Sequence, residues 1–174
     1  RVSSSLPVPR ARGFPPAGGM KTNPRDDPCI ELYGSTPDYL KVMGLRLKRG
    51  RFFTDADGSA SQPVLVITES TARTVWGQDD PLGSQVRIGP ADTGVWRTVI
   101  GVVGDVHHDD LTSRPTPAMY APEAQQTDSF LVAVVKTSSS DPSRLIAPLR
   151  NILSEIDPSV PVYAVAMVDD LVAG

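Results

Sequence analysis

The sequence places its two histidines side by side, in the group His107-His108-Asp109-Asp110. Imidazole and carboxylate side chains are the usual ligands of zinc and of neighbouring metals. Successive side chains diverge, however, and no further histidine exists to complete a site. We therefore interpret the group as a solvated loop. A metal-dependent hydrolase built around it is the alternative, and would need carboxylates from elsewhere in the chain.

Nucleophilic catalysis has little support in the residue pattern. Cys29 is the single cysteine, so the chain can form neither an internal disulfide nor a zinc site made of several cysteines. A serine or cysteine triad needs a base that the fold positions, and a G-x-S-x-G turn is also missing. We interpret the acidic pairs at 26–27, 79–80 and 169–170 as turn or helix-end residues. The sequence thus predicts no catalytic, metal-binding or cofactor-binding residues, and a protein that is not an enzyme.

Two glycines frame a second candidate, the segment Gly-Val-Val-Gly-Asp-Val at 101–106. It follows an apolar run, as dinucleotide-binding turns do, but it lacks the G-x-G-x-x-G spacing and no predicted helix follows it. We therefore expect no cofactor. Gly101 instead predicts a bulge or a close approach of two backbones, and Asp105 is expected to accept hydrogen bonds from turn amides. Trp76 and Trp96, at the edges of apolar elements, are predicted to pack rather than to bind a ligand.

Composition restricts the class of protein. The 174 residues are 40% hydrophobic and 21% charged, which is typical of a globular chain and enough for one domain or two small lobes. The formal net charge of -3 provides no basic surface for nucleic acid or for an anionic membrane. No run of about 18 apolar residues is present. Because the chain starts at Arg1 without Met and stops where a new helix begins, we expect a fragment of a longer protein.

The elements that position these residues alternate between strand and helix patterns. Apolar runs or alternating patterns predict strands at 29–33, 63–67, 85–88, 96–103, 118–120, 130–135 and 160–165, and helical spacings predict helices at 35–44, 68–76 and 142–156, with another starting at 166–171. The order favours an α+β fold, in which a mixed β-sheet carries helices mainly on one face. The Pro- and Gly-rich residues 1–28 are expected to be an extended or partly disordered lead-in to a core domain at 29–174.

Two of these helices have clear start and stop signals. Ser35 or Thr36 can cap the first helix, Pro37 suits its first turn, and Gly44 suits its end. The fully apolar run at 63–67 is typical of a strand that is covered on both faces. The helix that follows it is expected to end at Gly77.

Seven segments carry a recurring set of apolar and glycine positions, at 33–45, 47–57, 63–73, 80–83, 98–106, 117–122 and 157–162. Together they resemble the MacB-like periplasmic core domain of FtsX-type permeases. The family patterns that they resemble include V-S-P-x-Y-F-x-x-M-G-I, L-x-x-G-R-x-F, D-P-I-G and V-V-G-V-V-G-D-V. Thr68 stands where asparagine is common in the family. The likeness covers about residue 33 to the end.

The resemblance implies a function without catalysis. A domain of this family lies between the first two membrane helices of an ABC transporter permease, at the periplasmic or outer face of the bacterial inner membrane. It would couple ATP hydrolysis by a cytoplasmic ATPase to substrate export or other periplasmic work. Its implied partners are that ATPase, a possible periplasmic adaptor or substrate protein, and a second permease in a homodimer. The alternative is a soluble periplasmic module that binds a ligand or a partner.

Overall fold

The computed structural model describes residues 10–11, 30–89, 93–105, 117–126, 132–138, 141–159, 161–162 and 165. The chain divides into two compact units. The first comprises Arg1–His108 and Ser113–Val134, and the second comprises Asp109–Thr112 and Val135–Gly174.

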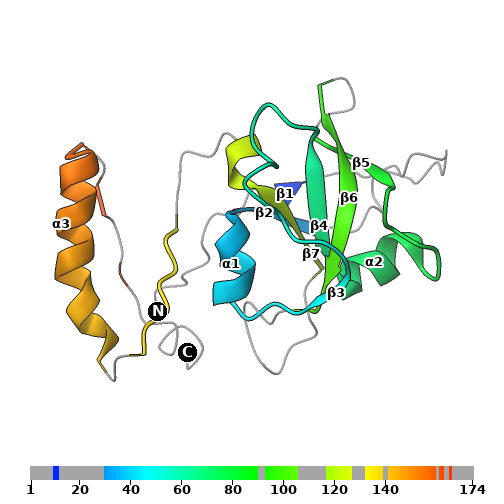
Figure 1. The fold of residues 1–174 in the computed structure, drawn as a ribbon. Helices are drawn as coiled ribbons and strands as arrows, with labels where there is room; N and C mark the ends of the chain where they lie inside the picture. Colours follow the sequence, from blue (N-terminus) through cyan, green and yellow to red (C-terminus); the bar gives the residue numbers. More distant parts are fainter. Residues whose placement is uncertain are drawn as a thin grey trace. The chain divides into compact units, whose positions relative to one another are not determined.

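A seven-stranded mixed sheet forms the centre of the first unit (Figure 1). Its strands are β1 (Arg10–Ala11), β2 (Ile30–Ser35), β3 (Leu47–Gly50), β4 (Val64–Thr68), β5 (Gln85–Ile88), β6 (Val95–Val103) and β7 (Ala118–Pro122). They follow the order β1-β2-β7-β4-β6-β3, and β5 also pairs with β6. The β2/β7 and β4/β6 pairs are parallel, and the remaining pairs are antiparallel. The predicted α+β class with a mixed sheet is confirmed.

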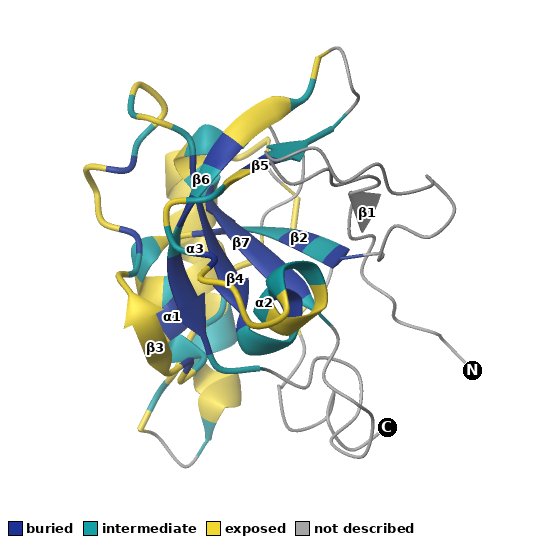
Figure 2. Ribbon diagram, turned by 90° about the vertical axis from the view of Figure 1, so that its right-hand side faces the viewer, coloured by how far each residue is buried: buried dark blue, intermediate teal, exposed yellow. Residues whose placement is uncertain are grey.

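Strand β4 separates two apolar cores, because all five of its residues are buried (Figure 2). Leu65 and Ile67 belong to one core, against which helix α2 (Glu69–Trp76) packs. Val64 and Val66 belong to the other, which includes Leu40 of helix α1 (Pro37–Val42). The two helices thus take opposite faces of the sheet instead of mainly sharing one. The physical reason is that a strand with apolar side chains on both faces needs cover on both.

The predicted start and stop signals of both helices are present. Thr36 is the N-cap of α1, although its side chain makes no capping hydrogen bond, and Pro37 is the first helical residue. Gly44 follows the helix with a φ of 69°. The hydroxyl of Thr68 caps α2 by accepting a hydrogen bond from the amide of Thr71 at 3.3 Å. Gly77, with a φ of 61°, ends α2 as predicted.

The described part of the second unit is mainly helical. A 3-10 turn η2 (Pro142–Leu145) leads directly into helix α3 (Ile146–Ile156). The carboxylate of Asp141 accepts a hydrogen bond from the amide of Ser143 at 3.2 Å, and Asp157 is the C-terminal cap. This confirms the helix that the sequence predicts after Asp141.

Two predicted strands do not form where the structure describes them. Of the predicted strand at 130–135, residues 132–135 have no strand pairing, and Val132 and Val135 are exposed. Of the predicted strand at 160–165, the described residues 161, 162 and 165 are also not paired with another strand. An apolar run forms a strand only when a neighbouring strand makes hydrogen bonds with its backbone N–H and C=O groups. The helix predicted at 166–171 and the lead-in other than strand β1 lie outside the described residues.

Strand β3 is a feature that the sequence pattern missed. All four of its residues are exposed, and its centre carries Lys48 and Arg49, so it has no apolar alternation. It is a strand because β6 provides an antiparallel partner for it. Among the described helices, none is long and apolar enough to cross a membrane.

Candidate functional site

The group His107-His108-Asp109-Asp110 lies outside the described residues. Within the described ranges, no three His, Cys, Asp or Glu side chains are grouped so that they could hold a metal ion. Cys29 also lies outside these ranges. The loop interpretation of the histidines therefore stays a prediction, and the candidate site has to be built from other residues.

Gly101 has the role that its position in β6 predicts. The pairing of β4 with β6 shifts by one residue between Leu65 and Val66, so that Ile100 is the extra residue of a bulge. A Cβ atom at Gly101 would overlap the carbonyl group of Arg51. Glycine is required here because the chain after β3 crosses close to the backbone of β6.

Asp105 ties the end of β6 to the start of helix α2. Its carboxylate accepts a hydrogen bond from the amide of Ser70 at 2.8 Å and pairs with the guanidinium of Arg73 at 3.0 Å. An unpaired amide in the first helical turn favours a negative partner. The expectation that Asp105 accepts amide hydrogen bonds is therefore correct, but the amide belongs to a helix rather than to a loop.

A second carboxylate organises the turn after β3. Asp57 is buried, and its two oxygens accept hydrogen bonds from both terminal nitrogens of Arg51, at 2.7 and 2.8 Å. The amide and the hydroxyl of Thr54 also donate to it, at 2.8 and 3.0 Å. The Arg51 hydrogen bonds lower the pKa of Asp57 to about 2, against the opposing effect of its burial. The carboxylate is thus ionised at neutral pH and fixes residues 54–57 as a turn.

Gln125 connects this region to the sheet. Its side-chain oxygen accepts hydrogen bonds from Arg97 and from the amide of Val64, both at 3.1 Å. Its side-chain nitrogen donates to the carbonyl oxygen of Gly58 at 3.2 Å and to the hydroxyl of Ser61 at 3.0 Å. The short helix η1 (Glu123–Gln125) is therefore joined to both β4 and the 58–62 loop. No signal in the sequence indicates this role for Gln125.

Arg97 is the least expected polar residue of the first unit, because only 4% of it is exposed. Its terminal nitrogens donate to the side chain and to the carbonyl oxygen of Gln125, at 3.1 and 3.0 Å, and its Nε has no partner. Burial lowers the pKa of the guanidinium. A buried charge is stabilised through hydrogen bonds, and here the Gln125 contacts provide them.

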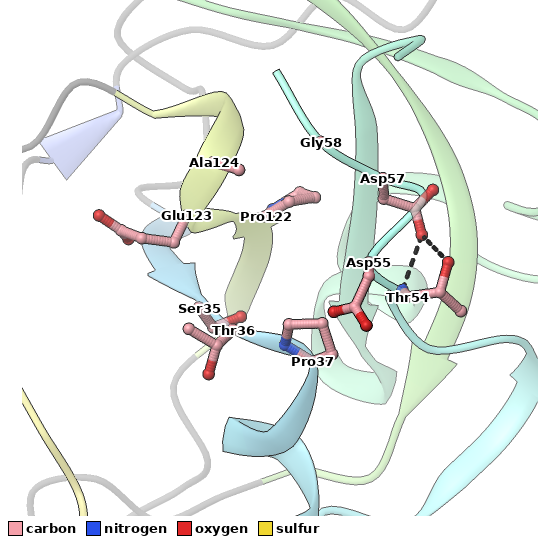
Figure 3. Close-up of a pocket in the computed structure, with 10 residues that line it drawn as sticks. All are labelled: Ser35, Thr36, Pro37, Thr54, Asp55, Asp57, Gly58, Pro122, Glu123 and Ala124. Atoms are coloured by element: carbon pink, nitrogen blue, oxygen red, sulfur yellow. Dashed lines mark hydrogen bonds between the residues drawn. The ribbon is translucent and has the colours of Figure 1, made fainter. Parts of the chain in front are cut away.

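A small pocket lies beside the Asp57 turn (Figure 3). Its volume is about 170 Å³. Three parts of the fold meet there, namely the junction of β2 and α1, the turn at 54–58, and the junction of β7 and η1. The residues that line it are Ser35, Thr36, Pro37, Thr54, Asp55, Asp57, Gly58, Pro122, Glu123 and Ala124. The sequence indicated only a polar turn here, since segments far apart in the chain form the wall.

The two tryptophans differ in their surroundings. Trp76 packs against the core under α2, as predicted for a packing residue. Trp96 is 41% exposed, and the guanidinium of Arg87 lies 5.4 Å from its ring centre. The prediction that Trp96 is a packing anchor is thus wrong in part, because the β5/β6 pair extends beyond the helices that cover the sheet.

Fold and contacts together define an α+β domain, in which the described polar groups hold the sheet, its turns and its helices in place. A family model described as the MacB-like periplasmic core domain matches residues 6–152. The chain belongs to this family of periplasmic core domains.

Similar proteins agree with this assignment. The macrolide export ATP-binding/permease protein MacB of Syntrophobacter fumaroxidans is 27% identical over 165 residues, which are 91% of this chain and 21% of that protein. The protein of the same name from Aggregatibacter actinomycetemcomitans is 38% identical over 74 residues, which are 42% of this chain and 11% of that protein. This chain therefore spans only a small part of the curated relatives that it matches.

A solved structure supports the fold. The crystal structure of the periplasmic region of MacB from Actinobacillus actinomycetemcomitans aligns with a TM-score of 0.60 at 22% identity. The alignment covers 84% of this chain and 63% of that chain. The α+β architecture is thus shared with a periplasmic region.

Proposed function

We propose that this chain is the extracytoplasmic domain of a MacB-type ABC transporter permease, at the periplasmic or outer face of the bacterial inner membrane. It couples ATP hydrolysis by a cytoplasmic ATPase to substrate export or other work outside the membrane, and it does not itself catalyse a reaction. The observation that carries the proposal is the family match over residues 6–152. The names of the relatives, which are ATP-binding/permease proteins, support the transporter context.

The packing of the first unit suits mechanical coupling. A part that transmits movement has to keep its shape when it is pushed at one end. The buried strand β4 has a core on each face, and the bulge of β6, the Asp105 contacts and the Gln125 contacts join neighbouring segments. These features support a role that rests on rigidity and surface contacts. The partners in this proposal are the ATPase, a periplasmic adaptor or substrate protein, and a second permease in a homodimer.

The first test is to determine the whole reading frame. We expect a hydrophobic helix before Arg1 and three more after Gly174. If the frame instead encodes only these residues behind a secretory signal, coupling is refuted and the soluble ligand- or partner-binding module replaces it.

The coupling itself is tested by movement. In the complete permease reconstituted with its ATPase, the native cysteines, Cys29 among them, are replaced by serine, and the exposed Ser59 is changed to cysteine and spin-labelled. A homodimer then has one distance between the two labels. We expect ATP binding to shift that distance and hydrolysis to restore it. An unchanged distance with and without ATP, in a transporter that hydrolyses ATP, would contradict the proposal.

A further inference from the structure

Arg97 is a buried cation without a matching anion. Only 4% of the residue is exposed, and within the described ranges no carboxylate forms an ion pair with it. Its Nε has no hydrogen-bond partner and is enclosed by protein atoms, so no external ligand can reach it. A buried charge without a counter-charge is costly, and an unsatisfied buried group in a native protein needs an explanation. Arg97 is therefore held in place at the expense of stability.

Gln125 provides the contacts that hold Arg97 inside. The terminal nitrogens of Arg97 donate to the side-chain oxygen and to the carbonyl oxygen of Gln125, at 3.1 and 3.0 Å. The side-chain oxygen also accepts from the amide of Val64, and the side-chain nitrogen donates to three oxygen atoms of the 58–62 loop, at 3.0 to 3.2 Å. If Gln125 moves away, the loop loses its connection to η1 and Arg97 loses these acceptors at the same time.

Gln125 also lies where the chain leaves the first unit. It is the last residue of η1, and the second unit resumes at Val135. A force on the chain beyond η1 therefore acts on Gln125 before it acts on β7. Once Gln125 is displaced, the long side chain of Arg97 can turn its charged end toward water. Water then solvates the charge, which offsets part of the lost hydrogen bonding.

We propose that Arg97 and Gln125 form a releasable latch. In the closed state, which the structure describes, the latch holds the 58–62 loop against η1. When η1 is displaced, Arg97 turns to solvent and the loop is released, so the latch is an element with two discrete arrangements. The latch rests on the proposed function only for the force that opens it, a movement of the second unit during ATP hydrolysis. The latch can therefore fail while the coupling role stands.

The first test is amide hydrogen exchange in the 174-residue chain, measured with Arg97→Met, which has an unbranched apolar side chain without the charge. The reporter is the Val64 amide, which loses its acceptor when the latch opens, and Ile67 at the buried centre of β4 is the reference. Arg97→Met should slow the exchange of Val64 by about three- to tenfold, because replacing a buried charge by an apolar group often stabilises the closed form. The exposed Arg46→Met is the control and should leave the exchange of Val64 unchanged.

The second test follows the latch in the complete permease reconstituted with its ATPase, by hydrogen exchange of residues 58–64 with and without ATP. We expect exchange in the wild type to differ between the two conditions. Gln125→Ala leaves the latch open, so exchange should be fast in both conditions, whereas Arg97→Met keeps it closed, so exchange should be slow in both. Gln126→Ala is the control and should keep the wild-type response to ATP, since the described contacts of the latch belong to Gln125.

The outcomes are distinct. If Arg97→Met leaves the exchange of Val64 unchanged or makes it faster relative to Ile67, Arg97 only stabilises the closed form and the latch is refuted. If the Ser59 labels move with ATP but the exchange of residues 58–64 does not respond, the coupling stands and the latch is wrong. If neither responds, the coupling fails as well, and the exchange of Val64 in the 174-residue chain then decides the latch by itself.

Discussion

Asp57 provides a quantitative test of the structure, through the substitution Asp57→Asn. The buried carboxylate has a pKa of about 2 against an ordinary value of 3.8. Such a difference corresponds to about 2 kcal/mol of folding stability. The side chain of Arg51 is 51% exposed, so solvent weakens its ion pair with Asp57. We therefore expect Asp57→Asn to lower the unfolding free energy by about 1–2 kcal/mol. Asparagine keeps the shape of the side chain but loses the ion pair.

The sign of the pH dependence follows from the direction of the pKa change. Because folding lowers the pKa of Asp57, its contribution is fully present above the unfolded-state value near 3.8 and is lost as the pH falls through about 2. Wild type should therefore exceed Asp57→Asn in unfolding free energy by about 1–2 kcal/mol at pH 6. The two proteins should become nearly equal at pH 2.

Urea unfolding followed by tryptophan fluorescence measures this difference, since Trp76 packs against the core under α2. The matched control is Asp55→Asn, two residues away, where the carboxylate is exposed and has no hydrogen bond to another residue of the described ranges. It should have the same unfolding free energy as wild type within about 0.5 kcal/mol. If Asp57→Asn and wild type differ equally at pH 6 and pH 2, the ion pair does not account for the stability of this turn.

Three further substitutions test the packing of the sheet by the same unfolding measurement. Gly101→Ala should lower the unfolding free energy by about 1–3 kcal/mol, because the added methyl group overlaps the backbone carbonyl of Arg51. Gly104→Ala should lower it less, because a methyl group there makes only ordinary contacts. Equal effects of the two substitutions would argue against the close approach of the two backbones at Gly101. Thr68→Val should lower the unfolding free energy by about 1–3 kcal/mol, because the Thr68 hydroxyl is hydrogen-bonded to the buried amide and carbonyl groups of Ala118 in β7. A loss near zero would contradict the importance of these hydrogen bonds. Gln125→Ala should destabilise more than Gln126→Ala, since only Gln125 satisfies a buried guanidinium; the reverse order would refute its role.

The strongest elements of the first unit were predictable from local sequence. The run at 63–67 gave the buried strand β4, and helix α2 lies between its predicted cap and Gly77. These signals are local, because apolar periodicity, capping groups and positive-φ glycines act within a few residues. Gly44, which suits the end of the first helix in the sequence, has the positive φ of 69° that such an end requires.

The candidate site could not be predicted in the same way. Ser35, Asp55 and Pro122 are brought to one pocket by the parallel pairing of β2 with β7 and by the turn that Asp57 holds. Neither residue type nor spacing indicates that Ser35 lacks a partner, because this depends on every atom around it. The sequence directed attention to the histidine pair, which lies outside the described residues.

By itself, the sequence determined the α+β class, the central strand, both helices of the first unit and the family resemblance, all of which depend on short-range patterns. Only the tertiary structure decided that α1 and α2 cover opposite faces, that the charged segment Leu47–Gly50 is a strand, and that Arg97 is buried against Gln125. Each of these depends on a partner distant in the chain, and the free energy of burial or pairing comes from that partner.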